Sequence, residues 1–405
     1  MNRSQVFFYV NSFVTLLAGN MFNYGMIILT RSVTASDALT GTAFLGVFGP
    51  TLLLGFYAGV LLDRLPRKLV LHTAQGIMFL NMLLFAFLLR YGFDEAQHAW
   101  LFISSSVVHG IALAFIVPSR FALIGNLFSP EQTGRATILL NILLLTAFGG
   151  APFLTGLVRQ SSAFPTVFGT IGLLFLAGYL ALIPVRVERT FPPKSVGTLH
   201  ELRVGLSFIF QKKIVLELLL ATFFGLFIVG PIQVLLPEFA RTVLLLGEAE
   251  RGAFMGCLGA GLLVGGILAR TLDASGHRGW IILAGILATG TTIGSLSYLA
   301  DAPGAALLMA LAGVAGGALS TLIPAAIQME TPDHVRGRVM SIYSMLFQAT
   351  PALSGFAMGL FSESQGLIPA IFFSGLATAS AALFCMVALR QLRTYGRAVL
   401  PASLS

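Results

Sequence analysis

Twelve long apolar segments constrain this chain more than any other feature of its sequence. They fall near residues 6–29, 41–62, 69–90, 99–124, 136–158, 164–185, 214–236, 252–272, 279–300, 304–329, 339–361 and 366–389. A helix rises about 1.5 Å per residue, so about 20 apolar residues cross a hydrocarbon core of roughly 30 Å. The sequence therefore predicts an all-α membrane protein with twelve transmembrane helices.

The composition excludes several other classes of protein. Apolar residues make up 56% of the chain and charged residues 10%, whereas soluble domains carry about 25% charged residues. Cys257 and Cys385 both lie in apolar runs, so neither a disulfide framework nor a thiolate metal site is expected. No lysine follows a glycine, which excludes a Walker A phosphate loop and ATP-driven pumping. Because no nucleophile–base pair or metal-ligand spacing is found, we expect no enzyme activity, no catalytic residues, no metal and no cofactor.

The distribution of basic residues predicts the orientation in the membrane. With both termini on one side, 19 of the 24 lysines and arginines fall in the loops or span ends of that side. The positive-inside rule then places both termini in the cytoplasm. The net charge of +8 thus reflects topology, and no nucleic-acid partner is expected. We expect a multi-pass protein of a bacterial inner (plasma) membrane, monomeric, with the lipid bilayer and a small-molecule cargo as its partners.

The longest non-apolar stretch divides the chain near its middle. It contains Pro192-Pro193 and then Leu199, Leu202, Leu206 and Ile209 at helical spacing. We interpret residues 191–213 as a cytoplasmic linker that carries an amphipathic helix on the membrane face. Residues 1–190 and 214–405 are then expected to form an N-terminal and a C-terminal six-helix bundle.

The two sides of this linker repeat a common pattern. Pro130 corresponds to Pro332, Gly134-Arg135 to Gly337-Arg338, and Pro152-x-x-x-Gly156 to Pro351-x-x-x-Gly355. The offset in each case is close to half of the chain. Two similar six-helix bundles that face each other are typical of transporters, which place the substrate site near the midplane between them.

The loop after the second segment reads GVLLDRLPRKLVL at residues 59–71. It resembles the loop signature of the major facilitator superfamily, G-x-L-a-D-r-x-G-r-k-x-x-l, with Pro66 in place of the usual glycine. The resemblance implies that Asp63 latches onto the start of the eleventh span and closes the cytoplasmic gate. The gating residues implied in this way are Gly59, Asp63, Arg64, Arg67, Lys68, Arg336 and Arg338. For the cations, the alternative is that they only anchor the chain at the membrane face.

Two further patterns resemble one branch of that superfamily. P-x-R-x-A-L at 118–123 and P-x-x-x-R-G-R-V-x-S at 332–341 look like those of bacterial exporters of macrolides and siderophores. Gly150, Pro152 and Gly156 are similar to a signature associated with antiporters. The resemblance implies efflux of a drug or a siderophore.

In that architecture spans one, four, seven and ten line the cavity. The polar residues of these spans that we expect to bind or guide cargo are Asn20, Asn23, Tyr24, Ser105, His109, Gln233 and Thr321. For each one, a hydrogen bond between helices is the competing interpretation. No Asp or Glu lies near the centre of a span. His109, near a midplane, and Glu217, about one turn inside the seventh span, are therefore the candidates for proton coupling.

These observations favour a secondary active transporter that exports amphipathic small molecules by alternating access, with a proton as the coupling ion. One alternative is an uptake carrier for a small polar nutrient, which the apolar cavity and the missing central charged pair disfavour. The other is a lysophospholipid transporter, or a sensor that has lost transport.

Overall fold

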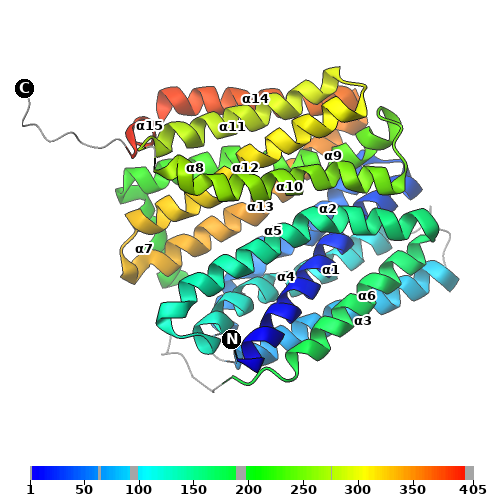
Figure 1. The fold of residues 1–405 in the computed structure, drawn as a ribbon, viewed down its shortest axis with the longest axis horizontal. Coiled ribbons are helices and arrows are strands. Elements are labelled where there is room, and N and C mark those ends of the chain that lie inside the picture. The colour runs from blue at the N-terminus through cyan, green and yellow to red at the C-terminus, as the bar shows by residue number, and fades with distance from the viewer. Residues whose placement is uncertain (1, 63–64, 92–98, 188–197, 275, 397–405) are drawn as a thin grey trace, which may run out of the picture.

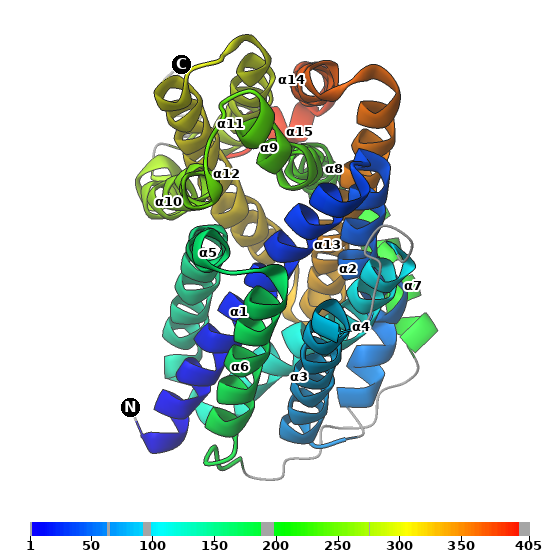
Figure 2. The ribbon, with the colours of Figure 1, turned by 90° about the vertical axis from the view of Figure 1, so that its right-hand side faces the viewer.

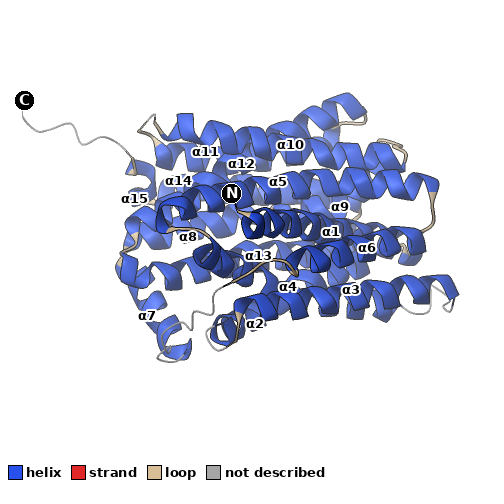
Figure 3. Cartoon of the chain, turned by 60° about the horizontal axis from the view of Figure 1, so that its bottom comes forward, coloured by secondary structure: helices blue, strands red, loops and turns tan. Residues whose placement is uncertain are grey.

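The computed structural model describes residues 2–62, 65–91, 99–187, 198–274 and 276–396, and these contain helices but no β-strand (Figure 3). The helices are α1 (Arg3–Thr34), α2 (Asp37–Leu62), α3 (Arg67–Tyr91), α4 (Ala99–Leu127), α5 (Pro130–Ser161), α6 (Phe164–Leu182), α7 (Thr198–Gln211), α8 (Lys213–Leu226), α9 (Val229–Thr242), α10 (Glu248–Asp273), α11 (Arg278–Ser295), the 3₁₀ turn η1 (Leu296–Tyr298), α12 (Ala302–Glu330), α13 (Asp333–Gln365), α14 (Leu367–Ala388) and α15 (Arg390–Thr394).

The helices confirm the predicted twelve-helix architecture. Eleven stretches of the described residues are long and apolar enough to cross a bilayer, with α8 and α9 together forming one of them, Lys213–Thr242. The twelfth predicted span, 339–361, lies in α13, which has 33 residues and is therefore about 50 Å long. Ser341, Ser344 and Gln348 make α13 more polar than the other spans, so its length rather than its hydropathy identifies it.

The seventh predicted span, 214–236, differs from the prediction because it is not one continuous helix. α8 ends at Leu226, and α9 begins at Val229 after a two-residue turn. Pro231 has no backbone N–H to donate to the carbonyl of Phe227, and its ring would clash with that carbonyl in a regular helix. The break therefore follows from the position of this proline.

Helices α1 to α6 form one half of the molecule and α8 to α14 the other (Figure 2). The halves meet along two pairs of neighbouring helices, α5 with α10 and α2 with α13 (Figure 1). The predicted repeat has the expected structural counterpart, because Pro152 lies inside α5 and Pro351 inside α13, one at each pair. The bundle boundaries at residues 190 and 214 stay predictions.

The bundle has two ends, a distal one and a proximal one. The distal end holds the α1–α2, α5–α6, α9–α10 and α13–α14 connections, and the proximal end holds the start of α1 and the short helix α15. At the proximal end α7 packs on α13, where Gly205 lies so close that an added Cβ would be 3.1 Å from Cβ of Arg338.

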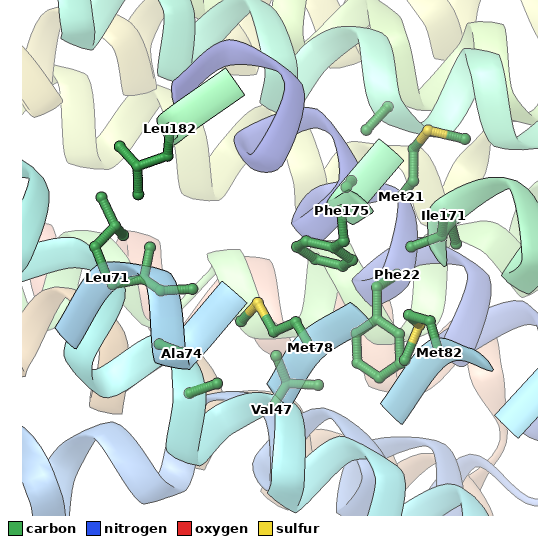
Figure 4. Close-up of a cluster of buried hydrophobic side chains, with 14 of the residues drawn as sticks. Met21, Phe22, Val47, Leu71, Ala74, Met78, Met82, Ile171, Phe175 and Leu182 are labelled. Carbon is green, nitrogen blue, oxygen red and sulfur yellow. The ribbon is translucent and has the colours of Figure 1, made fainter. Parts of the chain in front are cut away.

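The apolar core of the α1–α6 half fills the space between α1, α3 and α6. Figure 4 shows Phe22, Met82, Ile171 and Phe175 pointing into this space from three different helices. A second cluster joins the two halves near the distal end, where Tyr24 and Phe44 pack with Phe239 and Phe254. The charged residues Arg31 and Glu238 lie next to this second cluster.

Candidate functional site: an ion-pair network between the two halves

An ion-pair network joins the two halves at the distal end. Arg31 lies in the last turn of α1, and its Nε is 2.7 Å from Oδ1 of Asp37 at the start of α2. Its Nη2 is 3.2 Å from Oε1 of Glu238 in α9. The Asp37 and Glu238 side chains are only 7% and 4% exposed. One arginine therefore connects two buried carboxylates, one from each half of the molecule.

Neighbouring side chains complete the hydrogen bonding of these carboxylates. Arg241 donates from Nε and Nη2 to the two oxygens of Glu238, at 2.8 and 2.6 Å. Ser362 in α13 donates to Oδ2 of Asp37 at 2.5 Å. Glu363 accepts from the backbone N–H of Asp37 at 2.7 Å, where a carboxylate also stabilises the positive end of the α2 dipole. Because α13 and α2 belong to different halves, these two contacts also join the halves. We call Arg31, Asp37, Glu238, Arg241, Ser362 and Glu363 the distal clasp.

Glycines bring the backbones of the two halves into contact on the same side. A Cβ added to Gly149 of α5 would lie 2.7 Å from Cα of Gly259 in α10, and one added to Gly156 would lie 2.4 Å from the carbonyl of Glu248. On the opposite flank, a Cβ on Gly359 of α13 would lie 2.5 Å from the carbonyl of Asp37. Real Cβ atoms do not approach backbone so closely, so the distal closure requires glycine at these positions.

The gating residues implied by the loop signature lie at the proximal end. Asp63 and Arg64 lie outside the described residues, and Gly59 is part of α2. Arg67 donates to the Ala122 carbonyl (2.9 Å) and to Asn126 (2.7 Å) in α4. Lys68 donates to the carbonyls of Ile183 and Val185 after α6, both at 2.8 Å.

On the other half, Arg336 donates to the carbonyls of Gln328 and Thr331 at the end of α12, both at 3.2 Å. Arg338 lies beside α7. In this structure the contacts described for Arg67, Lys68 and Arg336 each stay within one half, so a latch from Asp63 to Arg336 or Arg338 stays a prediction for a proximally closed state.

The polar residues expected in the cavity are distributed over several surroundings. Tyr24 is 2% exposed and lies in the apolar cluster between the halves. Asn23 is 4% exposed, and its Oδ1 accepts no hydrogen bond. Gln233 in α9 is 6% exposed. Asn20 is half-buried and donates to the carbonyl of Leu16 on its own helix at 2.9 Å.

The residues expected on spans four and ten make local contacts. Ser105 exchanges hydrogen bonds with Asn81 of α3, with its hydroxyl 3.2 Å from Oδ1 and its carbonyl 3.0 Å from Nδ2. Thr321 is exposed and donates to the carbonyl of Gly317 at 3.0 Å.

The two candidates for proton coupling are both enclosed. His109 is 1% exposed, its ring stacks on Phe22 with centroids 4.1 Å apart, and Phe175 approaches at 5.9 Å. Its Nδ1 has no hydrogen-bond partner. Glu217 accepts from the backbone N–H of Leu392 in α15 at 2.7 Å. The structure thus places His109 in the core of one half and Glu217 at the proximal end of the other.

Sequence reasoning did not single out the distal clasp. Asp37 and Glu238 lie near span ends, where acids are common, and Arg31 and Glu238 are far apart in the sequence. The available signal was that Arg31 is one of only five basic residues on the sparsely basic side of the membrane. In the described ranges, the clasp included, no group of three or more His, Cys, Asp or Glu side chains could hold a metal ion.

Comparisons with known proteins agree with this architecture. The model of the Major Facilitator Superfamily matches residues 8–297, whereas no curated protein matches the sequence. Among solved structures, a D-xylose–proton symporter is similar at 15% identity with a TM-score of 0.75, over 93% of this chain and 97% of that one.

Two further structures have the same fold. A nucleoside transporter is 12% identical with a TM-score of 0.76, over 96% of this chain and 99% of that one. A bacterial homologue of the human lysosomal transporter Spinster, in an inward-facing and unoccupied conformation, is 14% identical with a TM-score of 0.72, over 98% of both chains. At such identities the likeness concerns the fold, while the family match covers more than half of the sequence. The chain therefore belongs to the major facilitator superfamily, and it is a secondary transporter of that type.

Proposed function

We propose that the chain exports amphipathic small molecules from the cytoplasm, with protons moving inward, and that the distal clasp is its outer gate. The observation that carries this proposal is the ion pair between Arg31 and Glu238, which connects helices of the two halves at one end of the bundle. In alternating access, the two halves must separate at one end when they close at the other. A contact that joins the halves at one end is therefore a gate.

The orientation of this gate is inferred from the basic residues. The positive-inside rule places the proximal end in the cytoplasm and the distal end outside. The close glycine contacts between α5 and α10 run from the middle of these helices to the distal end. The conformation is then one that is closed to the outside, in which an exporter collects its cargo.

The apolar character of the cargo is inferred from the state of the polar side chains. Asn20 and Thr321 are bonded to carbonyls of their own helices, and Ser105 is bonded to Asn81. These groups offer few free donors or acceptors to a polar nutrient. A cargo with a large apolar surface fits a wall of this kind, because its affinity then comes mainly from burial.

The distal clasp also offers carboxylates for proton coupling. Glu238 and Asp37 are buried between the halves and share Arg31. When the halves part, Glu238 loses its contact with Arg31 and keeps only Arg241, and a carboxylate with fewer cationic partners binds protons more readily. Protons from the outside would then stabilise the outward-open state. An inward proton gradient would in this way drive the opening of the distal end.

Transport by the purified protein in liposomes tests the proposal. Liposomes would be loaded with a macrolide, a catecholate siderophore or a lipophilic cation, and release would be followed under an imposed pH gradient. We expect movement of at least one cargo that stops when a protonophore is added. Arg270→Gln is the matched control, because Arg270 is exposed on α10 far from the clasp. Cargo movement that is indifferent to the pH gradient contradicts proton coupling, and no movement of any cargo by folded protein contradicts export.

A further inference from the structure

The distal end contains a small cavity that is lined by charged residues, and some of these do not belong to the distal clasp. It has a volume of about 60 Å³, which leaves room for several water molecules. Its charged lining consists of Arg31, Arg159, Arg241, Arg251, Glu238 and Glu248. We call these six residues and the space between them the distal pocket.

Both glutamates of the distal pocket are already paired. Glu238 is bound by Arg241 and Arg31, and Oε1 of Glu248 is 2.5 Å from Nη2 of Arg251. Arg31 is paired as well, through Asp37. Arg159 differs from the other three arginines, because in the described part of the chain no carboxylate lies within 4 Å of its guanidinium. The pocket therefore carries a positive charge without a counter-ion.

The Arg159 side chain is fixed at the edge of the pocket. It lies in the last turn of α5, donates from Nη1 to the Ser162 carbonyl at 3.0 Å, and stacks 4.4 Å above the ring of Phe164. Its Nε is buried and has no hydrogen-bond partner. A buried N–H donor without an acceptor is unfavourable, and more so when it carries charge.

Arg251 supplies a second donor of the same kind. The residue is only 9% exposed, and its Nε is also buried without a partner. It comes from α10 in the other half. Two guanidinium groups, one from each half, thus line one cavity, and each has a buried Nε without a hydrogen-bond partner.

We propose that the distal pocket binds the oxyanionic group of the transported molecule, a carboxylate or a phosphate, between Arg159 and Arg251. The planar guanidinium fork matches such groups in geometry as well as in charge. Ile27, Ile28 and Val234 also line the cavity and would contact the adjoining apolar part. This inference rests on the proposed export function and narrows its cargo to amphipathic anions, which excludes lipophilic cations.

The position of the site suits an exporter. Because Arg159 belongs to α5 and Arg251 to α10, the two donors move apart when the halves separate at this end. The anion is then held by one arginine instead of two, and its affinity falls as the pocket opens. A site built by both halves therefore releases its ligand on the outer side.

Binding of four matched probes to the full-length protein in nanodiscs tests the proposal. The probes are 4-phenylbutyrate, 4-phenylbutylphosphonate, 4-phenylbutanol and 4-phenylbutylamine, which share one apolar body and differ in the charge of the head. We expect both anions to bind at least tenfold more tightly than the alcohol, and the amine to bind more weakly than the alcohol. Equal binding of the amine and the carboxylate overturns the proposal.

Variants identify the site. Arg159→Gln is expected to reduce anion affinity about tenfold without changing the affinity for the alcohol, and Arg159→Lys should reduce it less because the charge stays. Arg270→Gln, which removes a charge outside the pocket, should leave anion affinity unchanged. Anion affinity that is the same in Arg159→Gln, in protein shown to be folded by its melting temperature, overturns the assignment.

Two more arms separate the possible outcomes. Nanodiscs with phosphatidylglycerol in place of phosphatidylcholine show whether the oxyanion comes from a lipid, since an anionic lipid headgroup in the site would displace the probes. Binding needs neither a gradient nor turnover, so anion binding without transport contradicts the export function alone. Proton-driven transport of the amine probe contradicts the anion site alone.

Discussion

Arg31 and Glu238 form the one ion pair in the described part of the chain that joins the α1–α6 half to the α8–α14 half, with Nη2 and Oε1 3.2 Å apart. The pair lies at the end of the bundle where glycines of α5 and α10 also allow the two backbones to touch. Electrostatic attraction and close packing therefore act at the same place, and each can be removed separately.

Glu238→Gln removes the charge from the clasp while it keeps the shape of the side chain. Arg31 then loses one of its two carboxylates, and weakening a buried charge-assisted contact costs about 1–3 kcal/mol. We expect the distal end to open more often. Spin labels at Gln160 and Leu245, both exposed on opposite halves, should show a longer distance by electron–electron double resonance.

Glu248→Gln is the control for this experiment. Glu248 pairs with Arg251 three residues along the same helix, so its neutralisation should not change the distance between the labels. A Glu238→Gln variant with the distance distribution of the wild type contradicts the role of the pair as a gate.

Gly149→Ala tests the packing contribution to the same closure. The added methyl group would lie 2.7 Å from Cα of Gly259, so the two helices cannot keep their present separation. We expect distal closure to weaken and cargo release to slow. Gly150→Ala offers a neighbouring control, because a Cβ at Gly150 meets no atom within 4 Å and alanine favours the helix by about 1 kcal/mol. If both variants transport alike, the glycine contact does not limit closure.

The fold could be predicted from the sequence because a transmembrane helix is a local property. Its length, apolar character and flanking charges all lie within about 25 consecutive residues. The internal repeat added the two halves and their relation. The break between α8 and α9 is also local, and Pro231 with its missing N–H was the signal for it.

The candidate site was harder to predict because it depends on contacts between distant segments. The partner of Arg31 is Glu238, and nothing near either residue indicates the other. Conversely, His109 was favoured because it is titratable and close to a midplane, but periodicity does not show which neighbour a helical face meets. The structure places that face against Phe22 and Phe175. Polarity within a span thus identifies unusual residues but does not tell cavity from core.

His109→Phe distinguishes packing from proton transfer at this position. If the ring only fills the core, phenylalanine should keep it filled, and the loss of an unpartnered Nδ1 should be neutral or stabilising. His109→Ala should lower the free energy of unfolding by about 3 kcal/mol, because it leaves a cavity. Proton-coupled transport that persists in His109→Phe supports a packing role, whereas cargo release that no longer depends on the pH gradient assigns the proton to His109.

Arg120→Met tests why a charge is retained inside the α1–α6 half. Arg120 is 4% exposed, donates from Nη2 to the hydroxyl of Thr15 at 2.5 Å, and has an unpartnered Nε. In the described part of the chain it forms no ion pair with a carboxylate. Because burying an unpaired charge is costly and methionine has a similar length, we expect the melting temperature of the variant to rise.

The same variant should also transport more slowly. An ionisable side chain that is costly to bury inside a membrane protein is expected to serve the transport function. Arg120→Lys provides the control, because it keeps the charge and should not raise the melting temperature. Lower stability of Arg120→Met together with unchanged transport would show instead that the guanidinium contributes to the fold through its bond to Thr15 and has no part in the transport cycle.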